Sequence, residues 1–195
     1  MNNKQWTTLL GLLALWFWFS LHSAETTVAL TNSNGLPGTM VEIDAGKYAT
    51  LQDALDQVPA EGGVVRLPAG LFEIDQPLLI TSENTTLAGV GPGTQIKNLN
   101  QNGLPTLQLR PATRDEDTRA RIWRLQIENL RLSGTEQCGD GILAEGVNEI
   151  FIQGVSVDHH GGHGIHMVDC YEDPRIADCI ITYNKKAGVY INKGH

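Results

Sequence analysis

The sequence predicts an all-β protein whose short strands coil into a parallel β-helix, a solenoid capped at its N-terminal end by an α-helix. Three observations predict this fold. The C-terminal third repeats every 24 or 25 residues, its apolar residues alternate with others over runs of three, and Gly, Asn or Asp separates the runs. Strands this short cannot bury their inner faces alone, whereas stacked repeats enclose an apolar column.

The repeat fixes which residues share a level in successive coils. Ile127, Ile152 and Ile176 lie 25 and 24 residues apart, and we expect them to stack inside the coil. A leucine-rich repeat would show one strand and one helix per unit, and a helical repeat would show a period of 3.6; neither fits. The other apolar columns are Leu130 with Val155 and Cys179, Leu132 with Val157 and Ile181, Ile142 with Ile165 and Val189, and Ala144 with Met167 and Ile191.

The N-terminal end of the domain has a different pattern. Residues 50–59, TLQDALDQVP, carry an apolar stripe at helical spacing. Thr50 followed by Asp53 is typical of a helix N-cap, and Pro59 ends the run. The next residues, 62–74, predict two strands joined by a Pro-Ala-Gly turn. We expect the helix to cover the open end of the apolar column, which would otherwise be exposed.

The first 24 residues predict export. A weakly positive start, the uncharged apolar run at 9–21 and a small residue at Ala24 are typical of a secretory signal peptide. The rival is an uncleaved membrane anchor, but the run is short for a span of ~20 residues. We therefore expect a signal peptide at 1–24, a lead-in at 25–44 and a β-helix domain at 45–195 that is incomplete at its C-terminus. The mature protein would be secreted, periplasmic or on the cell surface, with no stable membrane span.

The net charge indicates which class of partner to exclude, and the cysteine count limits the disulfides. With 14 Lys and Arg against 22 Asp and Glu, the chain is acidic, which argues against a nucleic-acid partner. Of the three cysteines, at least one must be free. Cys170 and Cys179 could pair, but the preferred interpretation is that these residues and Cys138 are small core residues.

The stretch DHHGGHGIH, residues 158–166, holds four of the six histidines. Because Ile165 and Met167 belong to apolar columns, alternation directs His166 outward. Tyr190 occupies the same column one coil later, and adjacent strands lie ~4.8 Å apart, so we expect these two side chains to be neighbours. His163 falls between the levels of Asp140 and Ala187. Asp158, His159 and His160 are expected on the rim of the turn.

By its sequence, the region from 45 to 195 resembles the right-handed parallel β-helix proteins of the pectate lyase, rhamnogalacturonase and epimerase-like superfamily. The resemblance rests on the capping helix, on VVRLPAG at 64–70 and on TTLAGVGPGTQI at 85–96, with the later repeats resembling further coils. It implies that the coil is right-handed. It also implies a substrate groove on the outer face of the sheet that contains Ile142, Ile165 and Val189, next to the histidines. It does not fix a reaction, because this fold carries many functions.

The resemblance leads us to expect an exported protein that acts on an acidic, uronate-containing polysaccharide by lyase or epimerase chemistry. Proton abstraction next to a uronate carboxyl needs a base, a proton donor and a group that neutralises the carboxylate. Histidine can be the base near neutral pH, tyrosine can donate, and arginine pairs with carboxylates. The candidate catalytic residues are His163, His166, Tyr190 and Asp158. The candidate substrate-binding residues are His159, His160, Asp140, Arg119 and Arg121.

Several alternatives stay open. The next coil makes the same turn with KKAGVYI, so the histidines could merely decorate a turn. A metal site at His159, His160 and His163 matches no zinc spacing, so no metal is assigned. No cofactor is required by the sequence, and calcium enters only through the resemblance. GHG at 162–164 resembles a polygalacturonase motif, but the paired aspartates are missing. A non-catalytic carbohydrate-binding module and a glycoside hydrolase with two carboxylates are the other function classes.

Overall fold

The computed structural model describes residues 36–194. The expected signal peptide at 1–24 lies outside the described residues. One compact unit begins at Pro37, and its first strand, β1 (Val41–Asp44), falls in the expected lead-in and pairs with the next strand of the stack. None of the helices within residues 36–194 is long and apolar enough to cross a membrane.

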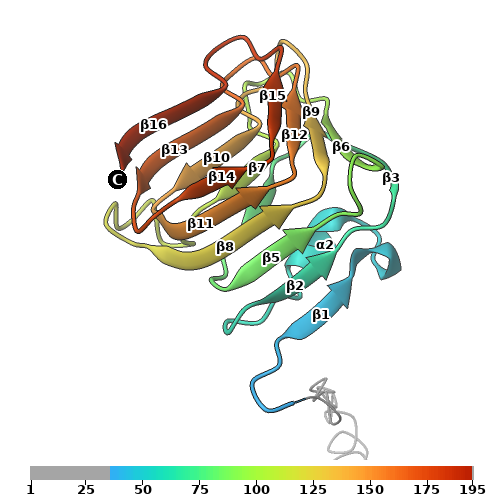
Figure 1. Cartoon of the computed structure of the whole chain (residues 1–195), viewed down its shortest axis with the longest axis vertical. Coiled ribbons are helices and arrows are strands. Elements are labelled where there is room, and N and C mark those ends of the chain that lie inside the picture. The colour runs from blue at the N-terminus through green and yellow to red at the C-terminus, as the bar shows by residue number, and fades with distance from the viewer. Residues whose placement is uncertain (1–35, 195) are drawn as a thin grey trace, which may run out of the picture. The chain divides into compact units, whose positions relative to one another are not determined.

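The strands form three parallel sheets that make the three walls of a coil (Figure 1). We name the sheets A, B and C. Sheet A holds β1, β2 (Gly63–Arg66), β5 (Thr85–Ala88), β8 (Ile122–Glu128), β11 (Val147–Gln153) and β14 (Arg175–Ala177). Sheet B holds β3 (Gly70–Ile74), β6 (Thr94–Asn98), β9 (Arg131–Ser133), β12 (Ser156–Asp158) and β15 (Ile180–Thr182). Sheet C holds β4 (Leu78–Ile80), β7 (Leu107–Leu109), β10 (Ile142–Glu145), β13 (Ile165–Cys170) and β16 (Val189–Gly194).

The predicted register is confirmed. Ile152 pairs with Ile127 on one side and with Ile176 on the other, and the columns that begin at Leu132, Ile142 and Ala144 pair in the same way. Ile127 and Ile152 are buried, and Ile176 in the last coil packs against the core while remaining partly exposed. The tight turn between sheets A and B repeats as well. Asn129, Gly154 and Asp178 stand in one column, with φ values of 53°, 63° and 52°, which these residue types tolerate.

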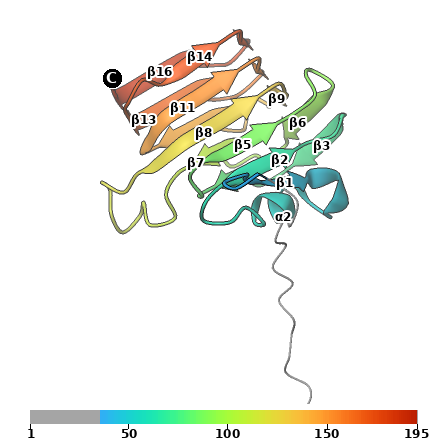
Figure 2. The same ribbon diagram turned by 60° about the horizontal axis from the view of Figure 1, so that its bottom comes forward.

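The capping helix is confirmed too. Helix α2 (Leu51–Leu55) follows the short 3-10 turn η1 (Ala45–Lys47) and begins at a capping box in which Thr50 and Asp53 satisfy each other's backbone N–H groups. Leu51, Ala54 and Leu55 are buried. Figure 2 shows α2 at the end of the stack, beneath the first coil, where it covers the apolar column.

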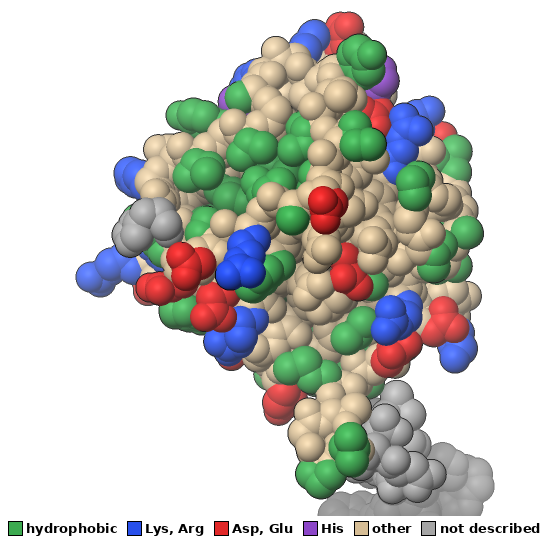
Figure 3. Space-filling view, viewed as in Figure 1, with side chains coloured by type: hydrophobic (Ala, Val, Ile, Leu, Met, Phe, Trp, Pro, Cys, Tyr) green, Lys and Arg blue, Asp and Glu red, His purple; other side chains and the backbone are tan. Residues whose placement is uncertain are grey.

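The opposite end of the described stack is apolar and exposed. Figure 3 shows hydrophobic side chains gathered on the surface over β14 and β16. Among the exposed apolar residues of the last coil are Ile180, Val189 and Ile191. The three cysteines are free: Cys138 and Cys170 are buried and Cys179 is half-buried, which agrees with small core residues.

Candidate active site

The site lies on the outer face of sheet C, at the amino ends of its last strands. His166 is the second residue of β13 and pairs in register with Tyr190 of β16, with Leu143 of β10 on its other side. The ring centroids of His166 and Tyr190 are 5.1 Å apart. Ile165 and Met167 are buried, so the expected alternation and the expected His166–Tyr190 contact are both confirmed.

Glycines set the turn that delivers these residues. Gly164 directly precedes β13, and a Cβ placed there would lie 2.4 Å from Cγ2 of Ile181 and 2.6 Å from the carbonyl oxygen of Gly188. The turn therefore packs closely against the next coil. This close approach brings the segment before β13 within reach of both neighbouring coils.

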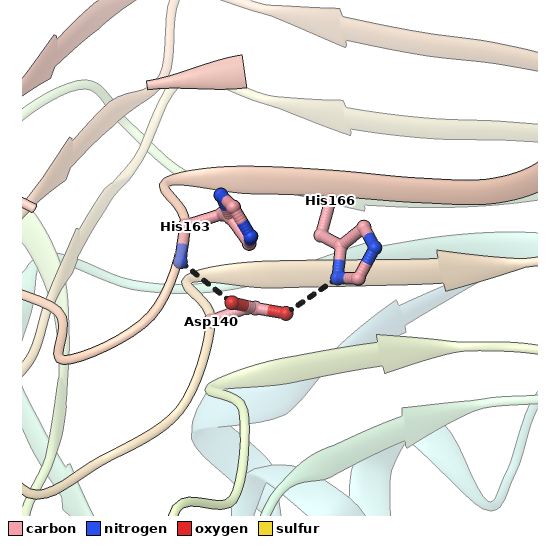
Figure 4. Close-up of side chains that lie close together, drawn as sticks. All are labelled: Asp140, His163 and His166. Atoms are coloured by element: carbon pink, nitrogen blue, oxygen red, sulfur yellow. Dashed lines mark hydrogen bonds and ion pairs between the residues drawn. The ribbon is translucent and has the colours of Figure 1, made fainter. Parts of the chain in front are cut away.

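Asp140 joins the two histidines (Figure 4). It comes from the turn before β10, one coil earlier. Its Oδ1 accepts a hydrogen bond of 2.6 Å from the backbone N–H of His163, and its Oδ2 lies 2.8 Å from Nδ1 of His166. The side chains of Asp140 and His166 are only 15% and 20% exposed, so this contact is largely shielded from solvent. Asp140 thus orients His166 and anchors the turn that carries His163.

The hydrogen bonds assign a hydrogen to one nitrogen of each ring. A carboxylate can only accept, so Nδ1 of His166 carries the hydrogen and Nε2 has a free lone pair. Nε2 is shielded and has no hydrogen-bond partner within residues 36–194. In His163 the arrangement is reversed: Nδ1 accepts the backbone N–H of Ala187 at 3.1 Å, which places the hydrogen of the neutral ring on Nε2. One ring can accept a proton and the other can donate a hydrogen bond.

The ring of His163 completes a stack of three aromatic side chains. It lies against Tyr190 at 4.7 Å and 15°, and 5.1 Å from His166. Burial lowers the pKa of His163, the charge of Asp140 acts to raise it, and a proton on His166 or the charge of Lys186 acts to lower it further. The net pKa of His163 is below its ordinary value, which favours the neutral ring. We call Asp140, His163, His166 and Tyr190 the groove cluster.

Asp158 does not join this cluster. It ends β12 on sheet B, where Arg131 donates to both of its oxygens at 2.8 and 3.0 Å. Nδ1 of His159 lies 2.6 Å from the same carboxylate, and the His159 ring stacks on Tyr183. Burial acts to raise the pKa of Asp158, but the hydrogen bonds from Arg131 and His159 outweigh it and hold the pKa below its usual range. Asp158 is therefore a structural ion-pair partner here.

His160 is not on a rim either, because its side chain is buried inside the turn. It is 1% exposed, and its Nε2 lies 2.8 Å from the hydroxyl of Thr106. Burial lowers its pKa to about 4, against smaller opposing effects from Asn184, Asp158 and Asp140. A group this enclosed cannot contact a polysaccharide, so the expectation that His160 binds substrate is wrong.

The expected arginines lie at the other end of sheet C. The loop 110–121 leaves the carboxyl end of β7, whereas the groove cluster lies at the amino ends of β10, β13 and β16. Because the strands are parallel, all their amino ends lie on one side of sheet C and all their carboxyl ends on the other. Arg119 is fully exposed beside Asp117. Arg121 bonds backbone carbonyls of its own loop and lies over the ring of Tyr171. Neither joins the histidines. Lys186, which precedes β16 at the correct edge, was not among the candidates, although the repeat aligns it with Gly162.

Three members of the groove cluster meet the distance condition for a metal site. One ligand atom from each of Asp140, His163 and His166 lies within 4.8 Å of the others. Two of the three are already engaged, however: both oxygens of Asp140 accept hydrogen bonds, and the Ala187 contact places the hydrogen of His163 on Nε2, which leaves Nε2 of His166 as the one unengaged ligand atom. Calcium prefers six to eight oxygen ligands, and two imidazoles with one carboxylate do not fit it. The arrangement favours proton transfer over metal binding.

Comparisons with known proteins agree with this architecture. A family model described as the right-handed β-helix region matches residues 112–195. The fold is a right-handed parallel β-helix of the pectate lyase-like type. No curated protein sequence matches this β-helix chain.

Two solved structures share the fold of the chain. One is ORF18 of Geobacillus virus E2, with 20% identity and a TM-score of 0.62 over 67% of this chain and 28% of that one. The other is the A-module of the Azotobacter vinelandii mannuronan C-5 epimerase AlgE4, with 18% identity and a TM-score of 0.54 over 78% of this chain and 50% of that one. The chain therefore spans about a quarter of the length of the viral protein and about half of the length of the epimerase module.

Proposed function

We propose that this β-helix protein acts on an acidic polysaccharide by removing a proton next to a uronate carboxyl, as a lyase or an epimerase. The observation that carries the proposal is the groove cluster, in which a carboxylate-oriented histidine, a second histidine and a tyrosine meet at one edge of sheet C. The fold shared with a mannuronan C-5 epimerase module supports the same reaction class.

His166 is the base in this proposal. Its Nε2 takes the proton from the sugar carbon, the electron pair passes into the adjacent carboxyl group, and Asp140 stabilises the imidazolium through Nδ1. The hydroxyl of Tyr190 supplies a proton, either to the leaving glycosidic oxygen in a lyase or to the opposite face of the sugar in an epimerase. Because Nε2 of His166 is shielded, a neighbouring ring must move before substrate reaches it, and Tyr190 is 43% exposed and free to do so.

A glycoside hydrolase is less well supported. Hydrolases need two carboxyl groups roughly 5 to 9.5 Å apart across the scissile bond. On β10 the next outward carboxylate after Asp140 is Glu145, five residues on, which at strand spacing is roughly 16 Å away. Glu145 is also engaged by Gln108 and Arg110.

The test is incubation with a panel of uronate polymers in D2O. A lyase produces ultraviolet-absorbing unsaturated ends, and an epimerase incorporates deuterium at the abstracted position, which NMR detects. Tyr190→Phe keeps the ring that stacks on His163 but removes the proton donor, so turnover should fall by roughly 10²- to 10⁴-fold.

His159→Ala is the matched control: the sequence nominated His159 as a substrate contact, but in the structure this exposed histidine contacts Asp158 and Tyr183 and lies outside the groove cluster. It should leave turnover unchanged. Reducing ends without unsaturation would replace the proposal with hydrolysis. Polymer binding without turnover that survives His166→Ala would replace it with a binding module.

A further inference from the structure

A pocket lies beside the groove cluster, at the same edge of sheet C. It has a volume of about 260 Å³ and includes Asp140, Leu143 and Lys186 in its lining. Its floor is made largely of glycine backbone from three successive turns: Gly103, Gly139, Gly161 and Gly162.

Packing excludes a side chain at three of these four glycines, and the fourth, Gly103, has a φ of +73° that side chains rarely adopt. A Cβ on Gly139 would lie 2.3 Å from the carbonyl oxygen of Gly103, and one on Gly161 would lie 2.3 Å from that of Glu136. A Cβ on Gly162 would lie 2.2 Å from Oδ1 of Asp140. Gly103, Gly139 and Gly161 are exposed or half-buried, so a ligand ring can approach the backbone closely at these three positions.

The pocket contains one side-chain cation. Lys186 is exposed and has no ion-pair partner within the described part of the chain, whereas its neighbour Lys185 lies 3.0 Å from Glu136. The backbone N–H of Lys186 donates to the carbonyl oxygen of Gly162, which ties the lysine to the pocket floor. Asp140, the acidic group of the lining, already has both oxygens engaged by the two histidines. Lys186 is therefore the unpaired cation of the pocket.

We infer that this pocket is a second sugar subsite, in which Lys186 binds the carboxylate of the uronate unit next to the one that the groove cluster attacks. The inference rests on the proposed function for the position of the reacting unit. The chain carries a net charge of −8, so an anionic polymer is repelled at long range and a local cation is needed to hold it. The lysine selects an acidic neighbour, and the glycine floor accommodates its ring.

Calorimetric titration of the full chain tests the inference with two probes: a short mannuronate oligomer and the same oligomer with its carboxyl groups reduced to alcohols. Lys186→Met keeps the aliphatic stem and removes the charge. It should bind the acidic oligomer roughly five- to twentyfold more weakly and the reduced oligomer as well as the wild type does. Lys185→Met is the matched control and should bind both oligomers like the wild type.

Turnover separates this inference from the proposed function. Lys186→Met should raise KM and leave kcat unchanged, since the lysine contacts a unit that does not react. Unchanged binding of the acidic oligomer by Lys186→Met, or an equal loss for both oligomers, overturns the subsite. Binding that depends on Lys186 in a protein with no turnover supports the subsite and overturns the proposed reaction. A wild type that binds neither oligomer overturns both.

Discussion

The two histidine pairs of residues 158–166 lie only a few residues apart, yet they have opposite surroundings. His159 and His160 belong to the turn after sheet B: one is exposed beside Asp158, and the other is buried against Thr106. His163 and His166 lead into sheet C and meet Asp140 and Tyr190. The chemistry of a histidine here depends on what the neighbouring coils place beside it, and the local sequence alone does not reveal it.

The largest effect is expected at His166. His166→Ala should reduce turnover on the responsive uronate polymer by roughly 10²- to 10⁴-fold, because it removes the proposed base. The free energy of unfolding should fall by about 1–3 kcal/mol, since the change opens no core cavity but leaves the shielded carboxylate of Asp140 without one hydrogen-bond partner. Steady-state kinetics and urea denaturation measure the two quantities. If the variant is stable and keeps full turnover, His166 is not the base and the assignment of the chemistry to the second histidine pair is wrong.

In the pair formed by His159 and His160, the buried His160 should make the stability of the protein depend on pH. In the folded protein the pKa of His160 is about 4, below its ordinary value of 6.5. Above pH 6.5, this histidine is therefore neutral in both the folded and the unfolded chain. As the pH falls from 6.5 toward 4, the unfolded chain gains a proton that the folded chain does not, and the protein loses about 3 kcal/mol of stability.

Urea denaturation at several pH values, with His160→Ala for comparison, checks this effect. The variant should lack that part of the slope. The pKa of Asp158 is also lowered from 3.8, so its contribution is lost as the pH falls through that value and overlaps only the low-pH end of this window. Equal slopes for variant and wild type would show that His160 can be protonated in place.

At neutral pH, His160→Ala should cost about 1–3 kcal/mol of stability, because it removes the hydrogen bond to Thr106 and the ring beside Gly134 and Gly141. The fraction that folds should keep its turnover. Denaturation midpoints and activity per folded molecule separate these outcomes. A loss of turnover without a loss of stability would assign His160 to the reaction.

The smallest effect belongs to His159. Its side chain is 60% exposed and contacts Asp158 and Tyr183. Because Arg131 holds Asp158 independently, His159→Ala should change stability by less than about 0.5 kcal/mol. Thermal denaturation against the wild type measures it, and a shift as large as that of His160→Ala would mean that the exposed stack on Tyr183 stabilises the turn.

The coil and part of the groove cluster were predictable from the sequence because alternation decides which side chains point inward. Once Ile165 and Val189 share a column, His166 and Tyr190 must be neighbours, and the pairing confirms it. Turns follow no such period. The burial of His160, and the use of Asp158 by Arg131 of the preceding coil, depend on how each turn folds against its neighbours.

The arginines were misplaced for a related reason. Loop 110–121 is long enough to reach many places, but it starts at the carboxyl edge of sheet C, and strand direction decides which edge a loop serves. The same rule applied to the residues before β16 would have found Lys186.

Tyr190 lies on β16, which among the described strands pairs only with β13. One of the three rings in the groove cluster's aromatic stack thus depends on a strand held from one side, while His166 and Asp140 belong to coils enclosed on both sides. Strands of this kind open at a lower free energy than the whole domain. In a stack made of residues 36–194 alone, warming should therefore displace the tyrosine by fraying before the coil melts, so that the temperature limit of function and the temperature limit of the fold are set by different strands.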